Sequence, residues 1–256
     1  MQQSKLAVFT ATVAFSLSPM AASADNHEVP NITPIEIFGC NYMDGKGMDD
    51  LMRTTSRWND WMDKEGREEY WAYILNPIMH SPEMTFDVLW VGGWSNGNSM
   101  GESMEFWINQ GADQGAEFSK VVDCSVHALF ATITLKPSTE PWRAGPVSFN
   151  DCHVKNNRSY EDVFDKIGEW AAYEVEQGVD SSHFAMFPAY GETSDADYSF
   201  KWVSGFDYKN FGANFEMFGN GGGWMKSEEL LDDVVKCDSG RVYHAVPVRT
   251  IELEDG

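Results

Sequence analysis

Two histidines are the residues of this 256-residue chain whose types and positions best suit chemistry. His127 lies three residues after Cys124, and His244 lies seven residues after Cys237, each inside an apolar strand-like segment. Strand alternation places each histidine on a mostly apolar face, and one polar group facing an apolar cavity is a common way to build a ligand pocket. His127 and His244 are therefore candidates for proton transfer or iron ligation. The plainer alternative is a hydrogen-bonded core histidine.

Two tryptophans are candidates for contact with a flat ligand. Trp90 and Trp202 stand in the aromatic stretches FDVLW and YSFKW. Alternation puts Trp90 on one face with Phe86 and Val88. The ordinary interpretation of such a stripe is core packing beneath helices, and the alternative is the wall of a ligand site.

Two pairs of polar residues lie at or within the following helical segments. Asn98 and Asn210 precede these segments, where helix N-capping would explain them without any ligand. Glu105 and Glu216 lie on the helices, where exposed acids are expected in so acidic a chain, whereas a buried acid would be a base candidate. All four are retained as candidate ligand contacts.

Several familiar catalytic patterns are missing from the sequence. It contains no G-x-S-x-G, H-E-x-x-H, P-loop or EF-hand pattern. The glycine run at 219–223 interrupts a helical segment and does not follow a strand, so a helix break explains it better than phosphate binding. The sequence therefore predicts no metal site and no cofactor.

The overall charge narrows the choice of partner. The formal net charge is −22, with 40 acidic and 18 basic residues. Such a field repels nucleic acid and anionic membrane surfaces. The high charge itself is best explained by solubility, and the alternative is attraction of a cationic ligand. The oligomeric state stays open.

The N-terminus resembles a secretory leader. Lys5 precedes an apolar run from Leu6 to Leu17, and Ala22-Ser23-Ala24 fits a cleavage site, so residues 1–24 are predicted to be a signal peptide. The apolar run is too short to span a bilayer. The expected location is periplasmic or secreted, where an even number of cysteines favours disulfides.

An internal repeat organises the remainder of the chain. Residues 86–98, FDVLWVGGWSNGN, recur in altered form at 198–210, YSFKWVSGFDYKN, at an offset of 112 (202 − 90). Cys40 and Cys152, and Trp58 and Trp170, are related by the same offset. We interpret this pattern as a duplication.

Periodicity predicts the same order of elements in both repeats. A first unit at 35–136 and a second at 147–250 are joined by a proline-rich linker at 137–146. The expected strands are 35–43, 69–75, 85–94, 125–135, 147–154, 183–189, 198–206 and 241–249. The expected helices are 48–64, 100–109, 116–122, 159–177, 210–218 and 227–235.

Each repeat therefore has the order β-α-β-β-α-β, the ferredoxin-like arrangement with an antiparallel sheet and helices on one face. In that topology the end of the first strand lies beside the start of the last. This predicts the disulfides Cys40–Cys124 and Cys152–Cys237, each closing a loop of about 85 residues and stabilising by about 4 kcal/mol.

Two such units in one chain resemble the dimeric α+β barrel superfamily, in which two ferredoxin-like units lay their sheets against each other to form a barrel. The resemblance covers about residues 35–250 and rests on element order and duplication. It implies an α+β fold of two tandem ferredoxin-like units forming an intrachain barrel. Members with activity include antibiotic-biosynthesis-type monooxygenases, muconolactone-isomerase-like enzymes, and haem-dependent chlorite dismutase-like and dye-decolorising peroxidases.

Three hypotheses for function follow. The first is a small-molecule-handling protein with a cavity between sheet and helices, of the cofactor-independent oxygenase or isomerase type that the resemblance implies. The second is a non-enzymatic binding or assembly protein that uses the fold as a scaffold. The third is a haem protein, which no histidine motif supports.

Overall fold

A computed structural model describes residues 31–137, 139, 143–192 and 196–251; the predicted leader at 1–24 lies outside these residues. The strands are β1 Ile32–Tyr42, β2 Tyr70–Met79, β3 Val88–Trp94, β4 Val122–Lys136, β5 Gly145–Val154, β6 Ser182–Tyr190, β7 Phe200–Gly205, β8 Val235–Cys237 and β9 Arg241–Arg249. The helices are α1 Met48–Lys64, α2 Gly97–Gln110, α3 Ala112–Phe118, α4 Tyr160–Glu176, α5 Tyr208–Gly219 and α6 Gly223–Leu231.

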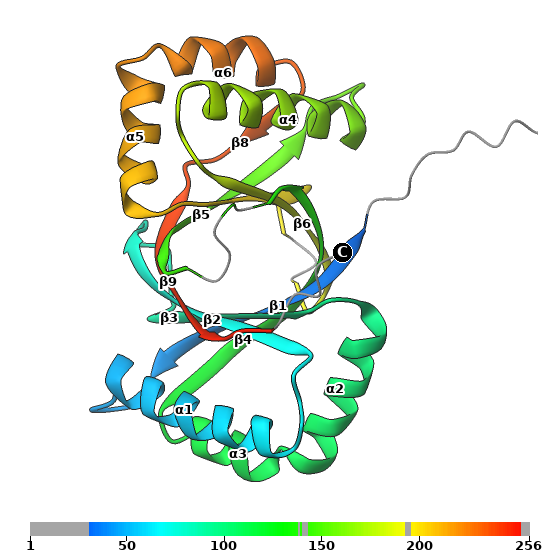
Figure 1. Ribbon diagram of the computed structural model, residues 1–256, viewed down its shortest axis with the longest axis vertical. Coiled ribbons are helices and arrows are strands. Elements are labelled where there is room, and N and C mark those ends of the chain that lie inside the picture. The colour runs from blue at the N-terminus through cyan, green and yellow to red at the C-terminus, as the bar shows by residue number, and fades with distance from the viewer. Residues whose placement is uncertain (1–30, 138, 140–142, 193–195, 252–256) are drawn as a thin grey trace, which may run out of the picture. The chain divides into compact units, whose positions relative to one another are not determined.

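The strands form one closed antiparallel sheet. Their order is β7-β6-β4-β1-β3-β2-β9-β5, and β5 pairs with β7 to close the ring. The short β8 pairs with β5 beyond the end of β9. In Figure 1 this barrel lies in the middle, with α1, α2 and α3 on one side and α4, α5 and α6 on the other.

The prediction of two tandem ferredoxin-like units, each with its own sheet laid against the other, is wrong. Strands from the two repeats are hydrogen-bonded to each other, β2 with β9 and β4 with β6, so one sheet contains both. A separate four-stranded sheet would leave unpaired N–H and C=O groups on each edge strand, and closure into a barrel removes those edges. The repeats are thus two halves of one barrel.

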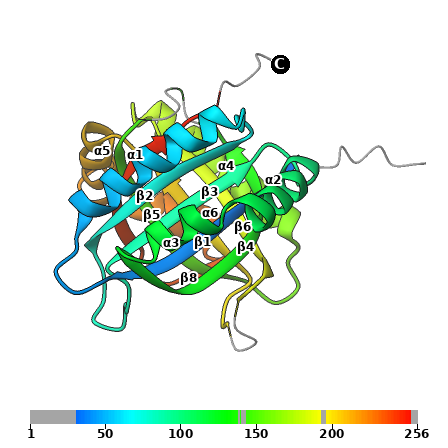
Figure 2. The same ribbon diagram turned by 90° about the horizontal axis from the view of Figure 1, so that it is seen from below.

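Strand alternation gives the barrel two kinds of core. Residues such as Ile35, Ile37 and Phe130 point inward and pack with residues of both halves. Alternate residues, such as Val88 and Trp90, point outward and pack beneath helices. Figure 2 shows α1, α2 and α3 lying across the outer face of the sheet. Of the predicted aromatic stripe, Val88 and Trp90 therefore lie beneath helices, whereas Phe86 packs with the barrel interior.

The long helices follow directly from local sequence. Helix α1 has the predicted bounds, and its buried Leu51, Trp58 and Met62 recur at helical spacing. Helix α4 begins at the N-cap Ser159, whose hydroxyl accepts from the backbone N–H of Asp162 while the Asp162 carboxylate accepts from that of Ser159. The shorter α3 and α6 begin four residues before their predicted starts.

Both predicted disulfides are confirmed, with Cys40 bonded to Cys124 and Cys152 bonded to Cys237. The β1–β4 pairing also contains a bulge: Phe38 pairs with His127 and Cys40 with Cys124, so β4 has one extra residue. Because a bulge reverses strand alternation, Cys124 and His127 face the same side although they are three residues apart. Their side chains line one cavity, described below.

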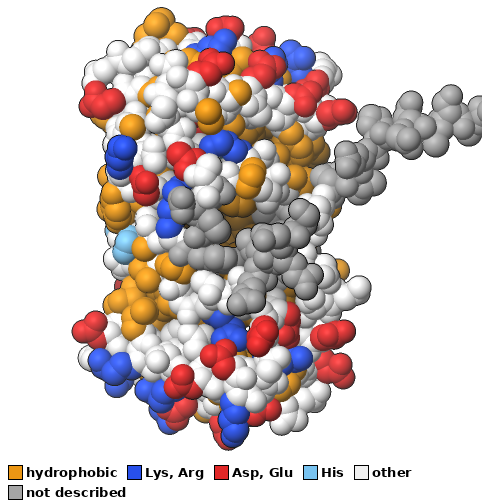
Figure 3. All heavy atoms as spheres, viewed as in Figure 1, with side chains coloured by type: hydrophobic (Ala, Val, Ile, Leu, Met, Phe, Trp, Pro, Cys, Tyr) orange, Lys and Arg blue, Asp and Glu red, His pale blue; other side chains and the backbone are white. Residues whose placement is uncertain are grey.

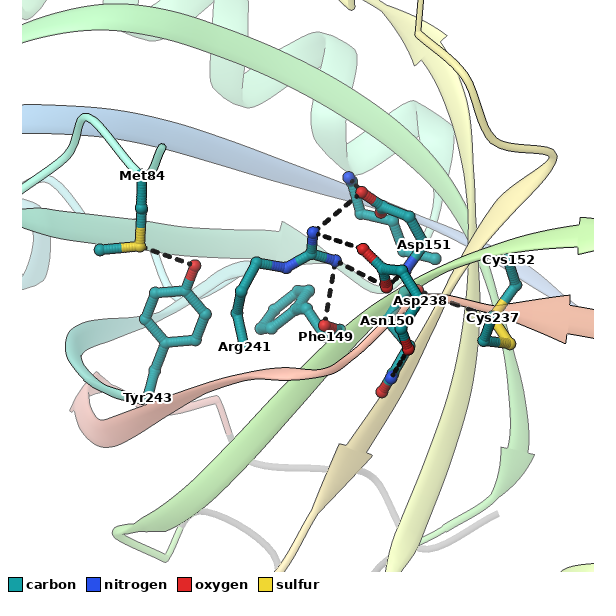
Figure 4. A network of polar contacts seen from close by, with 10 residues as sticks. Met84, Phe149, Asn150, Asp151, Cys152, Cys237, Asp238, Arg241 and Tyr243 are labelled. Atoms are coloured by element: carbon teal, nitrogen blue, oxygen red, sulfur yellow. Dashed lines mark hydrogen bonds and ion pairs between the residues drawn. A yellow bond between two sulfur atoms is a disulfide. The ribbon is translucent and has the colours of Figure 1, made fainter. Parts of the chain in front are cut away.

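Arg241 ties the ends of the barrel strands together near the second disulfide. Its guanidinium donates to the carboxylates of Asp151 and Asp238 and to the backbone oxygen of Phe149 (Figure 4). Lys201 donates to the same Asp151 carboxylate at 2.8 Å. These charges are satisfied by one another, so we assign this network a structural role.

The outer surface and the helix lengths bear on possible partners. In the face shown in Figure 3, charged side chains gather mainly over the helices at the two ends, and apolar side chains are more frequent around the barrel. Among the described residues, no helix is both long enough and apolar enough to cross a membrane.

Replacing both Cys152 and Cys237 by Ala should lower the free energy of unfolding by about 2–4 kcal/mol, because the opened loop spans 85 residues and the unfolded chain regains its freedom. Urea unfolding of the variant and the parent, each without reductant, measures the difference. An unchanged unfolding midpoint would contradict this assignment.

Candidate functional site

A cavity of about 450 Å³ lies between the outer face of the first half of the barrel and its helices. This volume is in the usual range for small-molecule sites. Most of the wall is apolar. The lining residues are Glu36, Phe38, Cys40, Leu51, Trp58, Met62, Tyr70, Val88, Trp90, Trp94, Ser103, Met104, Phe106, Trp107, Ile108, Phe118, Val122, Cys124 and His127.

A chain of hydrogen bonds crosses the sheet side of this cavity. Trp90 Nε1 donates to Tyr70 Oη at 2.7 Å, and Tyr70 Oη donates to Glu36 Oε1 at 2.6 Å. The other carboxylate oxygen, Glu36 Oε2, lies 2.8 Å from His127 Nε2. Glu36 thus holds Tyr70 with one oxygen and His127 with the other.

Neighbouring side chains fix the His127 ring in place. It stacks on Phe38 with centroids 3.8 Å apart. Its side chain is 50 % exposed, whereas that of Glu36 is 12 % exposed. An ionised carboxylate only accepts hydrogen bonds, so the neutral imidazole carries its proton on Nε2 and presents the Nδ1 lone pair. Such a carboxylate-oriented imidazole is suited to general-base catalysis.

Tyr70 keeps its proton in this arrangement. Burial, first of all, and then the charge and hydrogen bond of Glu36 raise the pKa of Tyr70 well above its usual value. The phenol is therefore neutral at physiological pH and acts as a fixed donor to Glu36. Gly92 makes room for it, because a Cβ at that position would lie 1.7 Å from Tyr70 Oη.

The second half contains a related chain of hydrogen bonds that is built from different residues. Trp202 Nε1 donates to His183 Nδ1 at 3.1 Å, and His183 Nε2 lies 2.6 Å from Glu174 Oε2. The side chains of His183 and Glu174 are 1 % and 2 % exposed. His183 pairs with Ser204 as Ala72 pairs with Gly92, so a histidine occupies the position of an alanine.

Glu174 is the second residue in which the two halves differ at this place. It lies 112 residues after Met62, a cavity-lining residue of α1 (174 − 62). A buried Glu–His pair therefore occupies positions where the first half has Met62 and Ala72. Because both polar groups are bonded to each other and to Ser181 or Trp202, we interpret them as structural.

The structure separates the two candidate histidines. His127 lies at the cavity wall, whereas His244 does not line it and instead bonds Tyr208 Oη through Nδ1 at 2.9 Å. Their registers also differ: His127 pairs with Phe38 of β1, and His244 pairs with Pro146 of β5. They are therefore not equivalent positions of the two halves.

The remaining candidates are scattered. Trp90 lines the cavity, and Trp202 packs in the core of the second half. Asn98 lies in the first turn of α2, whose N-cap is Asn96, so the capping interpretation was two residues out of place.

Asn210 lies inside α5, whose N-cap is Asp207, and its side-chain oxygen accepts from the backbone N–H of Asp180. Glu105 and Glu216 are exposed and do not line the cavity.

Sequence reasoning missed Glu36, Tyr70 and Trp94. Glu36 had a usable signal, since it is an acid in an alternating strand on the face that also carries Phe38 and Cys40. Tyr70 begins a strand-like segment and carried no signal, because its importance depends on the small Gly92 opposite it.

The cavity does not fit a haem. Among the described residues, His127 is the only histidine that lines the cavity, and its Nε2 is already held by Glu36. No Lys or Arg lines the wall to pair with the carboxylates of a haem, and Glu36 would repel them. Within the part of the chain that the structure describes, no cluster of three or more His, Cys, Asp or Glu residues could hold a metal ion.

Comparison with known proteins defines the fold alone. No protein-family profile and no curated protein matches the chain. A candidate monooxygenase from Lactobacillus acidophilus is similar in structure, with a TM-score of 0.52, 11 % identity, and coverage of 86 % of this chain and 96 % of that one. A mutant chlorite dismutase from Candidatus Nitrospira defluvii is also similar in structure, with a TM-score of 0.51 and 5 % identity, and the match covers 86 % of this chain and 93 % of that one.

A candidate monooxygenase from Fusobacterium nucleatum gives a TM-score of 0.50 at 10 % identity, covering 85 % of this chain and 93 % of that chain. These neighbours are chlorite dismutase-like and monooxygenase-like proteins. They agree with the superfamily resemblance at the level of fold, and at these identities they carry no site residue across.

Gly92→Ala should lower the free energy of unfolding by about 1–3 kcal/mol, because the new Cβ displaces Tyr70 Oη and leaves buried polar groups unpaired. Gly101→Ala is the control: no atom lies near its added Cβ, and alanine in a helix should stabilise by about 0.5–1 kcal/mol. Equal urea midpoints for Gly92→Ala and the parent would contradict the close contact.

His183→Ala should lower the free energy of unfolding by about 3 kcal/mol or more, because it removes the imidazole partner of the buried Glu174 and leaves the Trp202 N–H without its acceptor. The exposed His80→Ala is the matched control and should change it by less than about 0.5 kcal/mol. Thermal unfolding of both variants measures the effect, and a small change for His183→Ala would show that the pair is not closely bonded.

Proposed function

We propose that this protein binds a small, flat, uncharged molecule in the cavity beneath α1–α3 and removes a proton from it with His127. The observation that carries the proposal is the 2.8 Å contact between His127 Nε2 and Glu36 Oε2 at the wall of an apolar cavity. The fold itself serves many functions, so the proposal rests on the site.

The shape and charge of the wall support the ligand class. Phe38, Trp58, Trp90, Trp94 and Phe106 offer flat aromatic surfaces to a ring system. None of the described residues that line the cavity is cationic, and Glu36 contributes a negative charge, so a carboxylate or phosphate would be repelled. An uncharged ligand avoids this cost.

The His127–Glu36 pair would supply the chemistry. The Nδ1 lone pair takes a proton from an acidic C–H or O–H of the ligand, and the imidazolium formed is stabilised by Glu36 through Nε2–H. Tyr70 donates to the other Glu36 oxygen and is itself held by a hydrogen bond from Trp90. Loss of a proton next to a carbonyl leaves an enolate, the starting point for isomerisation or for reaction with oxygen.

The probe 2-tetralone tests this function, because it is flat, uncharged and carries acidic C–H groups beside a ketone. The wild-type protein in D₂O should accelerate exchange of these protons over buffer, measured by ¹H NMR. His127→Gln should reduce the acceleration about 100-fold or more, as expected for loss of a general base.

His80→Gln is the matched control, since His80 is exposed and lies outside the cavity, and it should keep the full rate. If the wild-type protein binds 2-tetralone but exchanges its protons no faster than His127→Gln does, the protein is a binding protein and the catalytic proposal fails.

A further inference from the structure

Trp94 carries a polar atom that the fold does not use. It is the last residue of β3, lines the cavity, and is 3 % exposed. Its indole nitrogen Nε1 is buried and has no hydrogen-bond partner among the described residues. A buried donor without an acceptor costs free energy, so such groups in native proteins call for an explanation.

Two other tryptophans of the barrel strands, Trp90 and Trp202, do not share this property. Trp90, four residues earlier, donates to Tyr70 Oη, and Trp202 in the second half donates to His183. Both of these indole N–H groups, one on β3 and one on β7, are therefore satisfied within the protein. The unpaired N–H belongs to Trp94, a residue that lines the cavity.

The duplication supplies an internal comparison. Trp94 corresponds to Phe206, 112 residues later, which is buried and packs against Phe211 with centroids 5.8 Å apart. Phenylalanine fills this position in the second half without introducing an N–H. An aromatic ring is thus sufficient for packing here, and the first half carries a hydrogen-bond donor in addition.

We infer that the Trp94 indole N–H recognises the ligand by donating a hydrogen bond to an oxygen atom of it. This inference rests on the proposed function for the location of the ligand, and it narrows the ligand class to uncharged molecules that carry a ketone, phenol or similar oxygen. A ligand with a negatively charged oxygen is disfavoured, because the described lining residues include the acidic Glu36 and none that is cationic.

The assignment also gives the two ends of the site different roles. His127 presents a hydrogen-bond acceptor, and Trp94 presents a donor. A ketone that accepts from Trp94 would be held more tightly as its oxygen gains negative charge during proton removal. Trp94 is then a specificity-determining residue that supports the base without replacing it.

Trp94→Phe tests the inference, because it places the residue of the second half at this position and removes only the N–H with part of the ring. Binding of 2-tetralone and of tetralin, its hydrocarbon counterpart without oxygen, is measured by calorimetry. Trp94→Phe should weaken the binding of 2-tetralone by roughly 2- to 12-fold, the range for loss of one hydrogen bond, and should change that of tetralin by less than twofold.

Trp170→Phe is the control for loss of a buried indole far from the cavity, and it should leave both affinities unchanged. Thermal unfolding of Trp94→Phe checks the fold, and its midpoint should equal or exceed that of the parent. Equal losses for ketone and hydrocarbon, or no loss for either, would overturn the inference.

The binding experiment separates this inference from the catalytic proposal. His127→Gln keeps Trp94, so it should still bind 2-tetralone more tightly than the double variant His127→Gln Trp94→Phe does. If proton exchange fails while this difference persists, the catalytic proposal is wrong and Trp94 recognition stands. If exchange succeeds and the difference is absent, the reverse holds.

Discussion

Closure of the sheet is the constraint on which the rest of this structure depends. The pairings β2–β9 and β4–β6 join the two repeats, and β5–β7 completes the ring. Once the ring is closed, the side chains of each strand point alternately into the barrel interior and outward to the layer beneath the helices. Each repeat supplies one helix-covered layer, and a functional cavity can form in either layer.

The two helix-covered layers contain similar hydrogen-bond chains that differ in their residues and in their burial. In both, a tryptophan of the third strand of the repeat donates to a side chain that bonds a glutamate: Trp90 through Tyr70 to Glu36, and Trp202 through His183 to Glu174. In the second half the glutamate comes from a helix and is buried with its histidine. In the first it comes from a strand and holds His127 at the cavity wall.

Features within one repeat could be predicted from the sequence, and pairing between the repeats could not. The bounds of α1 follow from its helical spacing, and both disulfides follow from the order of strands in a repeat. Closure of the barrel depends on pairing between strands of different repeats, such as β4 with β6, which periodicity does not reveal. Two separate sheets were therefore expected where one exists.

In the candidate site, too, the sequence indicated one residue, and the structure was needed to find its partner. His127 was identified because it is a polar residue on an apolar face, but its partner Glu36 lies 91 residues away and meets it only through the β1–β4 register and its bulge. His244 looked equivalent because it also follows a cysteine, and the register shows that it occupies another position. Residue type indicated the base, and only the structure identified the group that orients it.

Methyl NMR of ¹³C-methionine-labelled protein tests most directly whether the ligand binds in the cavity of the first half. Met62 and Met104 line the cavity, whereas Met217 lies in the core of the second half. Titration with 2-tetralone should shift the methyl signals of Met62 and Met104 together and leave that of Met217 in place. A shift confined to Met217, or no shift at Met62 and Met104 under saturating conditions, would contradict the account.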